Sequence, residues 1–172
     1  MTWPHPRTSS TNVTFLGRVT LSAVVGEEGC PSHPAWQRAG LWLEFDVREA
    51  GGGRSVAIAF PTIDHVMAAL RDLDQERHTE VTVGDDTGAY VTVGGGCGFY
   101  HVYMGADDHD DRVVLQRPVS TGSGSEPADV VMDGRLQRFA ARDIVDLDSA
   151  VEVVAEFIRT GRPSLDLPWR RA

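Results

Sequence analysis

The sequence of 172 residues contains no lysine, so all 16 of its basic residues are arginines. Its 25 acidic residues outnumber them and give a formal net charge of −9 at pH 7. Phosphate groups repel a chain of this charge, which argues against direct binding to nucleic acid or to an anionic membrane and favours a basic partner. Gly, Ala, Val and Asp are abundant, and all four have GC-rich codons. The missing lysine therefore indicates genome composition rather than a recognition role for arginine.

Long apolar runs and cysteine clusters are also missing. No segment approaches the roughly 20 apolar residues of a membrane-spanning helix, and the first residues lack the apolar core of a secretory signal. We therefore expect a cytoplasmic protein. Cys30 and Cys97 are expected to be reduced thiols, since neither has a metal-ligand spacing. With 41% hydrophobic and 24% charged residues, the chain is globular. We predict a flexible N-terminus over 1–12 and one domain over 13–172.

Alternating hydrophobic residues predict strands over 13–25, 41–47 and 56–60, with a flexible glycine-rich turn over 49–55. Turn residues at 84–88 join two further strands as a hairpin. A Gly- and Ser-rich segment over 119–129 predicts a mobile loop.

Two amphipathic helices complete the pattern. The first spans 62–76 with Thr62 as its N-cap, and its single histidine, His65, is expected to be structural or solvated. The second begins after Asp146 or Asp148 and ends at Gly161. The two apolar stripes are Ile63, Val66, Met67, Leu70 and Leu73, and Leu147, Val151, Val154, Phe157 and Ile158. We predict one α+β domain, with a mainly antiparallel sheet of about six or seven strands and two helices packed on one face.

The segment GGGCG at 94–98 has two interpretations. A phosphate-binding loop needs a helix directly behind its glycines. Residues 99–104 are instead aromatic, β-branched and alternating, which is typical of a strand. We therefore predict a bulged or kinked connection between strands.

Four carboxylates, those of Asp107, Asp108, Asp110 and Asp111, lie within five positions and repel one another. Such a cluster forms a solvated turn, contacts a basic partner, or holds a divalent cation. The cation is the weakest interpretation because the spacing differs from that of a calcium loop. The strand before the cluster carries candidate contact anchors, since aromatic residues favour interface centres; alternatively, one of its sides is core. These anchors are Tyr100, His101 and Tyr103.

Catalytic motifs of hydrolases, zinc proteases and zinc deaminases do not occur. Cys97 and His101 come nearest to a nucleophile pair, but four positions of extended strand separate them by about 13 Å. We predict no enzyme activity, no metal and no cofactor.

The YVTVGGG segment, the aromatic strand after it and the helix that ends AEFIRTGRPSLDLPW resemble the immunity proteins of bacterial polymorphic toxin systems. The resemblance covers 62–172 and is carried most by FIRTGRP and Trp169. It is closest to the family encoded beside nucleic-acid deaminase toxins, whose members are common in actinobacteria. It implies a non-enzymatic protein that binds a cognate basic toxin and covers its active site. The alternative is a small-molecule or peptide-binding module without a toxin.

Overall fold

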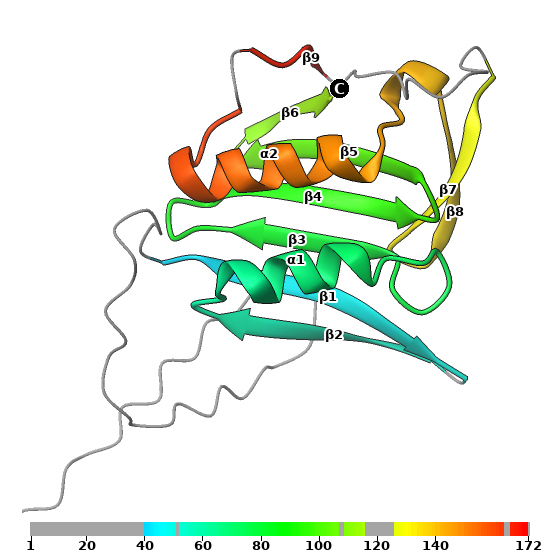
Figure 1. Ribbon diagram of the computed structural model, residues 1–172, viewed down its shortest axis with the longest axis horizontal. Coiled ribbons are helices and arrows are strands. Elements are labelled where there is room, and N and C mark those ends of the chain that lie inside the picture. The colour runs from blue at the N-terminus through cyan, green and yellow to red at the C-terminus, as the bar shows by residue number, and fades with distance from the viewer. Residues whose placement is uncertain (1–39, 51, 107–108, 116–125, 164–165, 172) are drawn as a thin grey trace, which may run out of the picture. The chain divides into compact units, whose positions relative to one another are not determined.

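Seven strands form one sheet in the order β2-β1-β3-β4-β5-β6-β9, and every neighbouring pair is antiparallel (Figure 1). Their bounds are β1 Trp42–Glu49, β2 Gly52–Ala59, β3 Glu80–Gly84, β4 Ala89–Gly96, β5 Phe99–Ala106, β6 His109–Leu115 and β9 Trp169–Arg171. A separate hairpin consists of β7 Ala128–Met132 and β8 Arg135–Phe139.

The computed structural model describes residues 40–50, 52–106, 109–115, 126–163 and 166–171. These residues all belong to one unit that spans Ser32–Ala172. The predicted strand over 13–25 and most of the predicted loop over 119–129 lie outside the described residues, and the division into a flexible N-terminus and one domain stays a prediction.

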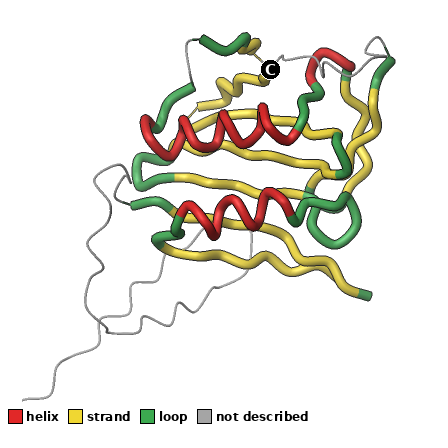
Figure 2. The backbone as a smooth tube through the Cα atoms, viewed as in Figure 1, coloured by secondary structure: helices red, strands yellow, loops and turns green. Residues whose placement is uncertain are grey.

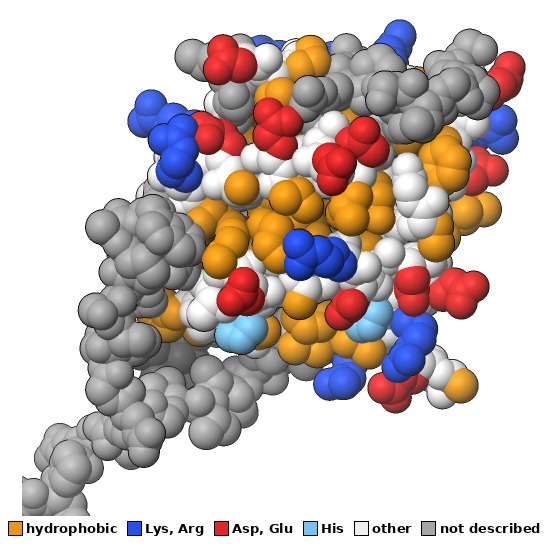
Figure 3. Space-filling model, viewed as in Figure 1, with side chains coloured by type: hydrophobic (Ala, Val, Ile, Leu, Met, Phe, Trp, Pro, Cys, Tyr) orange, Lys and Arg blue, Asp and Glu red, His pale blue; other side chains and the backbone are white. Residues whose placement is uncertain are grey.

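Helices α1 Ile63–Arg71 and α2 Leu147–Thr160 lie on the same face of the sheet (Figures 1 and 2). Alternate strand residues point toward them and form the main core, among them Leu43, Val83, Val93 and Val102. Hydrophobic side chains gather along the middle of the helix side, among charged ones (Figure 3). The predicted α+β class, with two helices on one face of a largely antiparallel sheet, is confirmed. No helix among the described residues is long and apolar enough to span a membrane.

Helix α1 begins with a capping box. The Thr62 hydroxyl accepts the His65 amide at 3.2 Å, and His65 Nδ1 accepts the Thr62 amide at 3.3 Å. His65 is therefore structural, as predicted. The helix ends at Arg71, five residues before its predicted end, in a turn built around Asp74, whose carboxylate accepts the amides of residues 76, 77 and 78. Burial raises the pKa of Asp74, but these amides outweigh it and hold the pKa below its usual value.

Helix α2 begins and ends at the capping residues that the sequence predicts. Asp146 is the N-cap and accepts the Ser149 amide at 2.8 Å, while Gly161 ends the helix at φ 68°. Val154, Phe157 and Ile158 are buried, and the other two predicted stripe residues are partly buried against the same core. The predicted apolar stripe is thus the face that packs on the sheet.

The glycine cluster forms a tight hairpin turn. Gly96 pairs with Phe99, so Cys97 and Gly98 alone connect β4 to β5, with φ 55° and 89°. Two positive φ values are the mark of a type I′ turn. A Cβ on Gly96 would lie 2.6 Å from the Leu73 carbonyl oxygen, so glycine lets the strand pass close to the chain after α1. The cluster is therefore a strand connection, as predicted, but a turn rather than a bulge.

The strands differ from the sequence interpretation at two places, and one hairpin was missed. Residues 52–55 belong to β2 rather than to a flexible turn, because β1 supplies the hydrogen-bonding partner that a glycine-rich segment lacks by itself. Asp110 and Asp111 lie within β6 rather than in a turn. The β7–β8 hairpin was missed, although its Asp133-Gly134 turn, with φ 47° and 67°, carries the dipeptide most typical of a two-residue hairpin.

Candidate partner-binding surface

The predicted anchor residues of β5 lie on opposite faces of the sheet. Tyr100 points toward the helices and is 5% exposed, and its backbone pairs with Val145 through bonds of 3.1 and 2.8 Å. His101 and Tyr103 point away from the helices, since strand residues alternate. Burial raises the pKa of Tyr100, which fits a phenol that stays neutral in the core.

His101 is 6% exposed because the β7–β8 hairpin covers it. Its ring stacks on Phe139 of β8 with centroids 3.9 Å apart and planes 21° apart, and its Nδ1 lies 3.0 Å from the carbonyl oxygen of Asp143. Burial lowers the pKa of His101, against the opposing effect of Asp143, so the ring is neutral at pH 7. The carbonyl is an acceptor, and Nδ1 therefore carries the proton.

The same hairpin covers the rest of this end of the sheet. Met132 lies over Gly94, and Val130 lies over Gly95, where a Cβ would come 2.9 Å from its Cγ1. A second hydrophobic cluster results, made of Val130, Met132 and Ile144 with Tyr103, Ala128 and Phe139 packed against it. We call this region the covered end of the face.

Beyond the covered end, the strand register aligns two rows of side chains, which we call the open rows. Row one runs from Trp42 to Gly84, Tyr90 and Gly105. Row two runs across β1, β3, β4 and β5 through Glu44, Thr82, Thr92 and Tyr103. Within row two, Thr92 is buried and Tyr103 borders the covered end, whereas Glu44 and Thr82 are partly exposed.

Two aromatic rings in row one lie over the glycines beside them. A Cβ on Gly84 would be 2.8 Å from Trp42 Nε1, and one on Gly105 would be 2.6 Å from the Tyr90 hydroxyl oxygen. Both rings are partly exposed, and Tyr90 meets Tyr103 edge-on with centroids 6.2 Å apart. Sequence reasoning did not name Trp42 or Tyr90 as candidate binding residues, because the glycines beneath their rings lie on neighbouring strands and are brought there by strand register.

The acidic segment, which carries Asp107, Asp108, Asp110 and Asp111, follows Gly105 of row one in the chain. Tyr90 pairs with Gly105, and Ala106, the next residue, pairs with His109 at the start of β6. Asp107 and Asp108 lie outside the described residues, and Asp110 and Asp111 belong to β6. The chain that carries the four aspartates therefore leaves β5 directly beyond Tyr90, and their contact with a partner stays a prediction.

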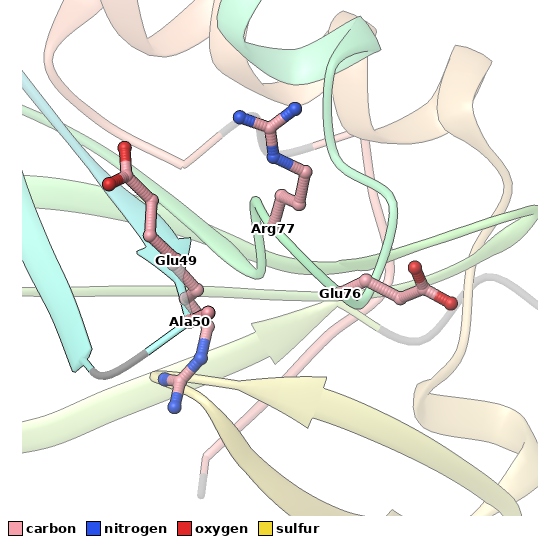
Figure 4. A pocket seen from close by; sticks show the side chains of 5 residues that line it. Glu49, Ala50, Glu76 and Arg77 are labelled. Atoms are coloured by element: carbon pink, nitrogen blue, oxygen red, sulfur yellow. The ribbon is translucent and has the colours of Figure 1, made fainter.

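A hollow of about 510 Å³ lies near the end of β1, away from the predicted site residues (Figure 4). Its lining carries two arginines and two glutamates: Arg48, Glu49, Ala50, Glu76 and Arg77. The mixed charges give no preference for an anionic or a cationic ligand.

The chemistry of an enzyme finds no support in the described part of the chain. Cys97 Sγ lies 3.5 Å from the Asp74 carbonyl oxygen, whereas His101 is bonded to Asp143, so these two side chains do not form a nucleophile pair. Among the described residues, no group of three or more His, Cys, Asp or Glu side chains is placed to hold a metal ion.

Comparison with known families adds one match. Residues 54–171 match the model of a family described as Immunity protein Imm1, and this range includes everything from β2 to β9 except the first residues of β2. A search among curated proteins found no match.

Proposed function

The chain belongs to the Imm1 family of immunity proteins, and from this premise we propose that it neutralises a cognate toxin by binding it tightly and covering its active site. The observation that carries the proposal is the family match over 54–171, which is more than half of the chain. The immunity-protein resemblance inferred from the sequence is thereby confirmed.

We further propose that the toxin is basic and modifies nucleic acid, as a deaminase does. Such a toxin presents cationic side chains to phosphates. An inhibitor with a net charge of −9 complements that surface, which speeds the encounter and selects the partner. The family match supports a toxin partner in general, and the charge supports its basic character. Neutralisation takes place in the cytoplasm on this proposal.

The acidic segment is the proposed point of charge contact, through Asp107, Asp108, Asp110 and Asp111. Tyr103 is partly exposed on the strand that leads to it. Buried Tyr100, on the helix side, and buried His101, on the same side as Tyr103, would hold that strand in place. Steering by these charges would act on the association rate, whereas desolvated contacts would act on the dissociation rate.

The experiment uses the cognate toxin domain, which this proposal expects to be encoded by the gene directly upstream. Cells that express this domain should survive when they also express the chain, and the purified pair should form a complex. Replacing the four aspartates by asparagine should slow association at low salt if they steer, or speed dissociation at all salt concentrations if they touch the toxin. Cells that die despite abundant folded chain would contradict toxin neutralisation.

A further inference from the structure

We propose that the toxin docks on the open rows, with Trp42 and Tyr90 as its apolar anchors and with its arginine or lysine side chains against these rings and the Glu44 carboxylate. This inference rests on the proposed function and names the surface that performs it. The surface is distinct from the acidic segment, although row one leads to that segment.

The anchors are held in place before any partner arrives. Gly84 leaves room for the Trp42 ring and Gly105 for the Tyr90 ring, and the edge-on contact with Tyr103 further fixes Tyr90. Ordering side chains on binding costs affinity, so rings that are already fixed lose little freedom. Tryptophan and tyrosine are also the side chains that dominate interface energetics.

The charge around the rings selects a basic partner. Glu44 is the one ionisable carboxylate in the two open rows as defined, and its Oε1 accepts a hydrogen bond from the Ser55 hydroxyl. Neither row contains an arginine. Row two continues through Val114 to Arg170, whose guanidinium is already paired with Asp143 at 3.0 Å. A cation placed over an aromatic ring is attracted by its face, and a nearby carboxylate adds to this attraction.

A second copy of the chain fits this surface less well. Two copies docked through the open rows would bring two Glu44 carboxylates and two acidic segments toward one another. Each copy carries a net charge of −9, so the contact would be repulsive. A basic toxin removes this repulsion.

The test measures the dissociation constant of the full chain with the purified toxin domain from the upstream gene. Trp42→Ala and Tyr90→Ala should each weaken binding about tenfold or more, as expected for anchor residues. Phe99→Ala is the matched control, because Phe99 is also an exposed aromatic residue of the sheet but lies at the β4–β5 turn. It should leave the dissociation constant unchanged within about twofold, the usual range for residues outside the anchors.

A charge change provides a second test that keeps both anchor rings; it gives up the hydrogen bond of 3.0 Å between the Thr82 and Thr92 hydroxyls, so the fold of this variant is also checked by circular dichroism. Thr82→Lys places a positive charge in row two, and Ala155→Lys places the same charge on an exposed position of α2, on the other side of the sheet. The Thr82 variant should weaken binding about tenfold by like-charge repulsion, and the Ala155 variant should not. If Trp42→Ala fails to fold, as judged by circular dichroism, the Thr82 and Ala155 pair decides.

The outcomes separate this inference from the proposed function. If the wild-type chain binds and protects, and the Trp42, Tyr90 and Thr82 variants bind equally well, the docking surface is wrong and the function stands. If the wild-type chain does not bind the toxin domain, both fail. A dimer in sedimentation that Tyr90→Ala dissociates, with toxin affinity unchanged, would show that a second copy occupies the rows and would overturn the inference.

Discussion

The face of the sheet away from the helices has two ends, and alternate strand residues line both of them. The two ends differ in what covers these residues. At the covered end, Gly94 and His101 lie beneath Met132 and Phe139 of the β7–β8 hairpin. In the open rows, Trp42 lies over Gly84 and Tyr90 over Gly105, and both aromatic residues remain partly exposed. The difference teaches that burial at the covered end serves folding, whereas the aromatic rings of the open rows contribute less to folding and remain available to a partner.

The largest loss of unfolding free energy is expected for a truncation on the helix side of the sheet. Phe157 is 0% exposed in α2, and Phe157→Ala should lower the free energy of unfolding by about 3–5 kcal/mol because it empties a buried aromatic site. Urea unfolding followed by circular dichroism measures the loss. Phe99→Ala, at a residue that is 50% exposed, is the control. A loss below about 1 kcal/mol for Phe157→Ala would show that α2 does not pack as described.

The second-largest loss of unfolding free energy is expected at the covered end. Met132→Ala should cost about 2–5 kcal/mol, since Met132 is buried over Gly94 between the hairpin and the sheet. Leu136→Ala on the same hairpin should stay within about 0.5 kcal/mol of wild type, because Leu136 is 70% exposed. Equal effects of the two variants would mean that the hairpin does not cover the face.

In the open rows the same kind of truncation should cost less. Trp42→Ala removes a larger side chain than Met132→Ala, but the ring is only partly buried, so the loss of unfolding free energy should be about 1 kcal/mol. Parallel urea titrations of the two variants give the comparison. If Trp42→Ala costs more than Met132→Ala, the ring is a core residue and the contrast between the two ends fails.

The smallest expected effect is the contribution of buried His101 to the pH dependence of stability. The folded state holds the pKa of His101 below the value of about 6.5 for the unfolded chain, so the unfolded state binds more protons. The stabilisation is complete above pH 6.5 and is lost as the pH falls toward the folded-state pKa. His101→Gln should therefore flatten the slope of unfolding free energy against pH below about 6.5. His65→Gln, at an exposed α1 position, serves as the control, and an identical slope in wild type and His101→Gln would contradict the burial of His101.

Local signals predicted much of the fold. Thr62, Asp146 and Gly161 mark helix ends through contacts within a few residues, so their sequence context suffices. The strand character of residues 52–55 could not be predicted in this way, because a glycine-rich segment becomes a strand only when β1 pairs with it. The β7–β8 hairpin had a local signal in Asp133-Gly134 that was not used.

The candidate surface was less predictable for the same reason. The sequence identifies the acidic cluster, and charge alone suffices for that. It does not show that Tyr100 faces the helices, nor that a hairpin from later in the chain buries His101. The placement of Trp42 over Gly84 joins residues that are 42 positions apart, and only the pairing of β1 with β3 brings them together.

Hydroxyl-radical footprinting of the chain, free and bound to the toxin domain from the upstream gene, tests the central claim most directly. Trp42 and Tyr90 on the open rows and Met67 on α1 are all partly exposed and reactive, and they lie on opposite sides of the sheet. The account predicts that the toxin lowers the oxidation rates of Trp42 and Tyr90 several-fold and leaves that of Met67 unchanged. Protection of Met67, with Trp42 and Tyr90 oxidised as fast in the complex as in the free chain, would place the toxin on the helix side and contradict the account.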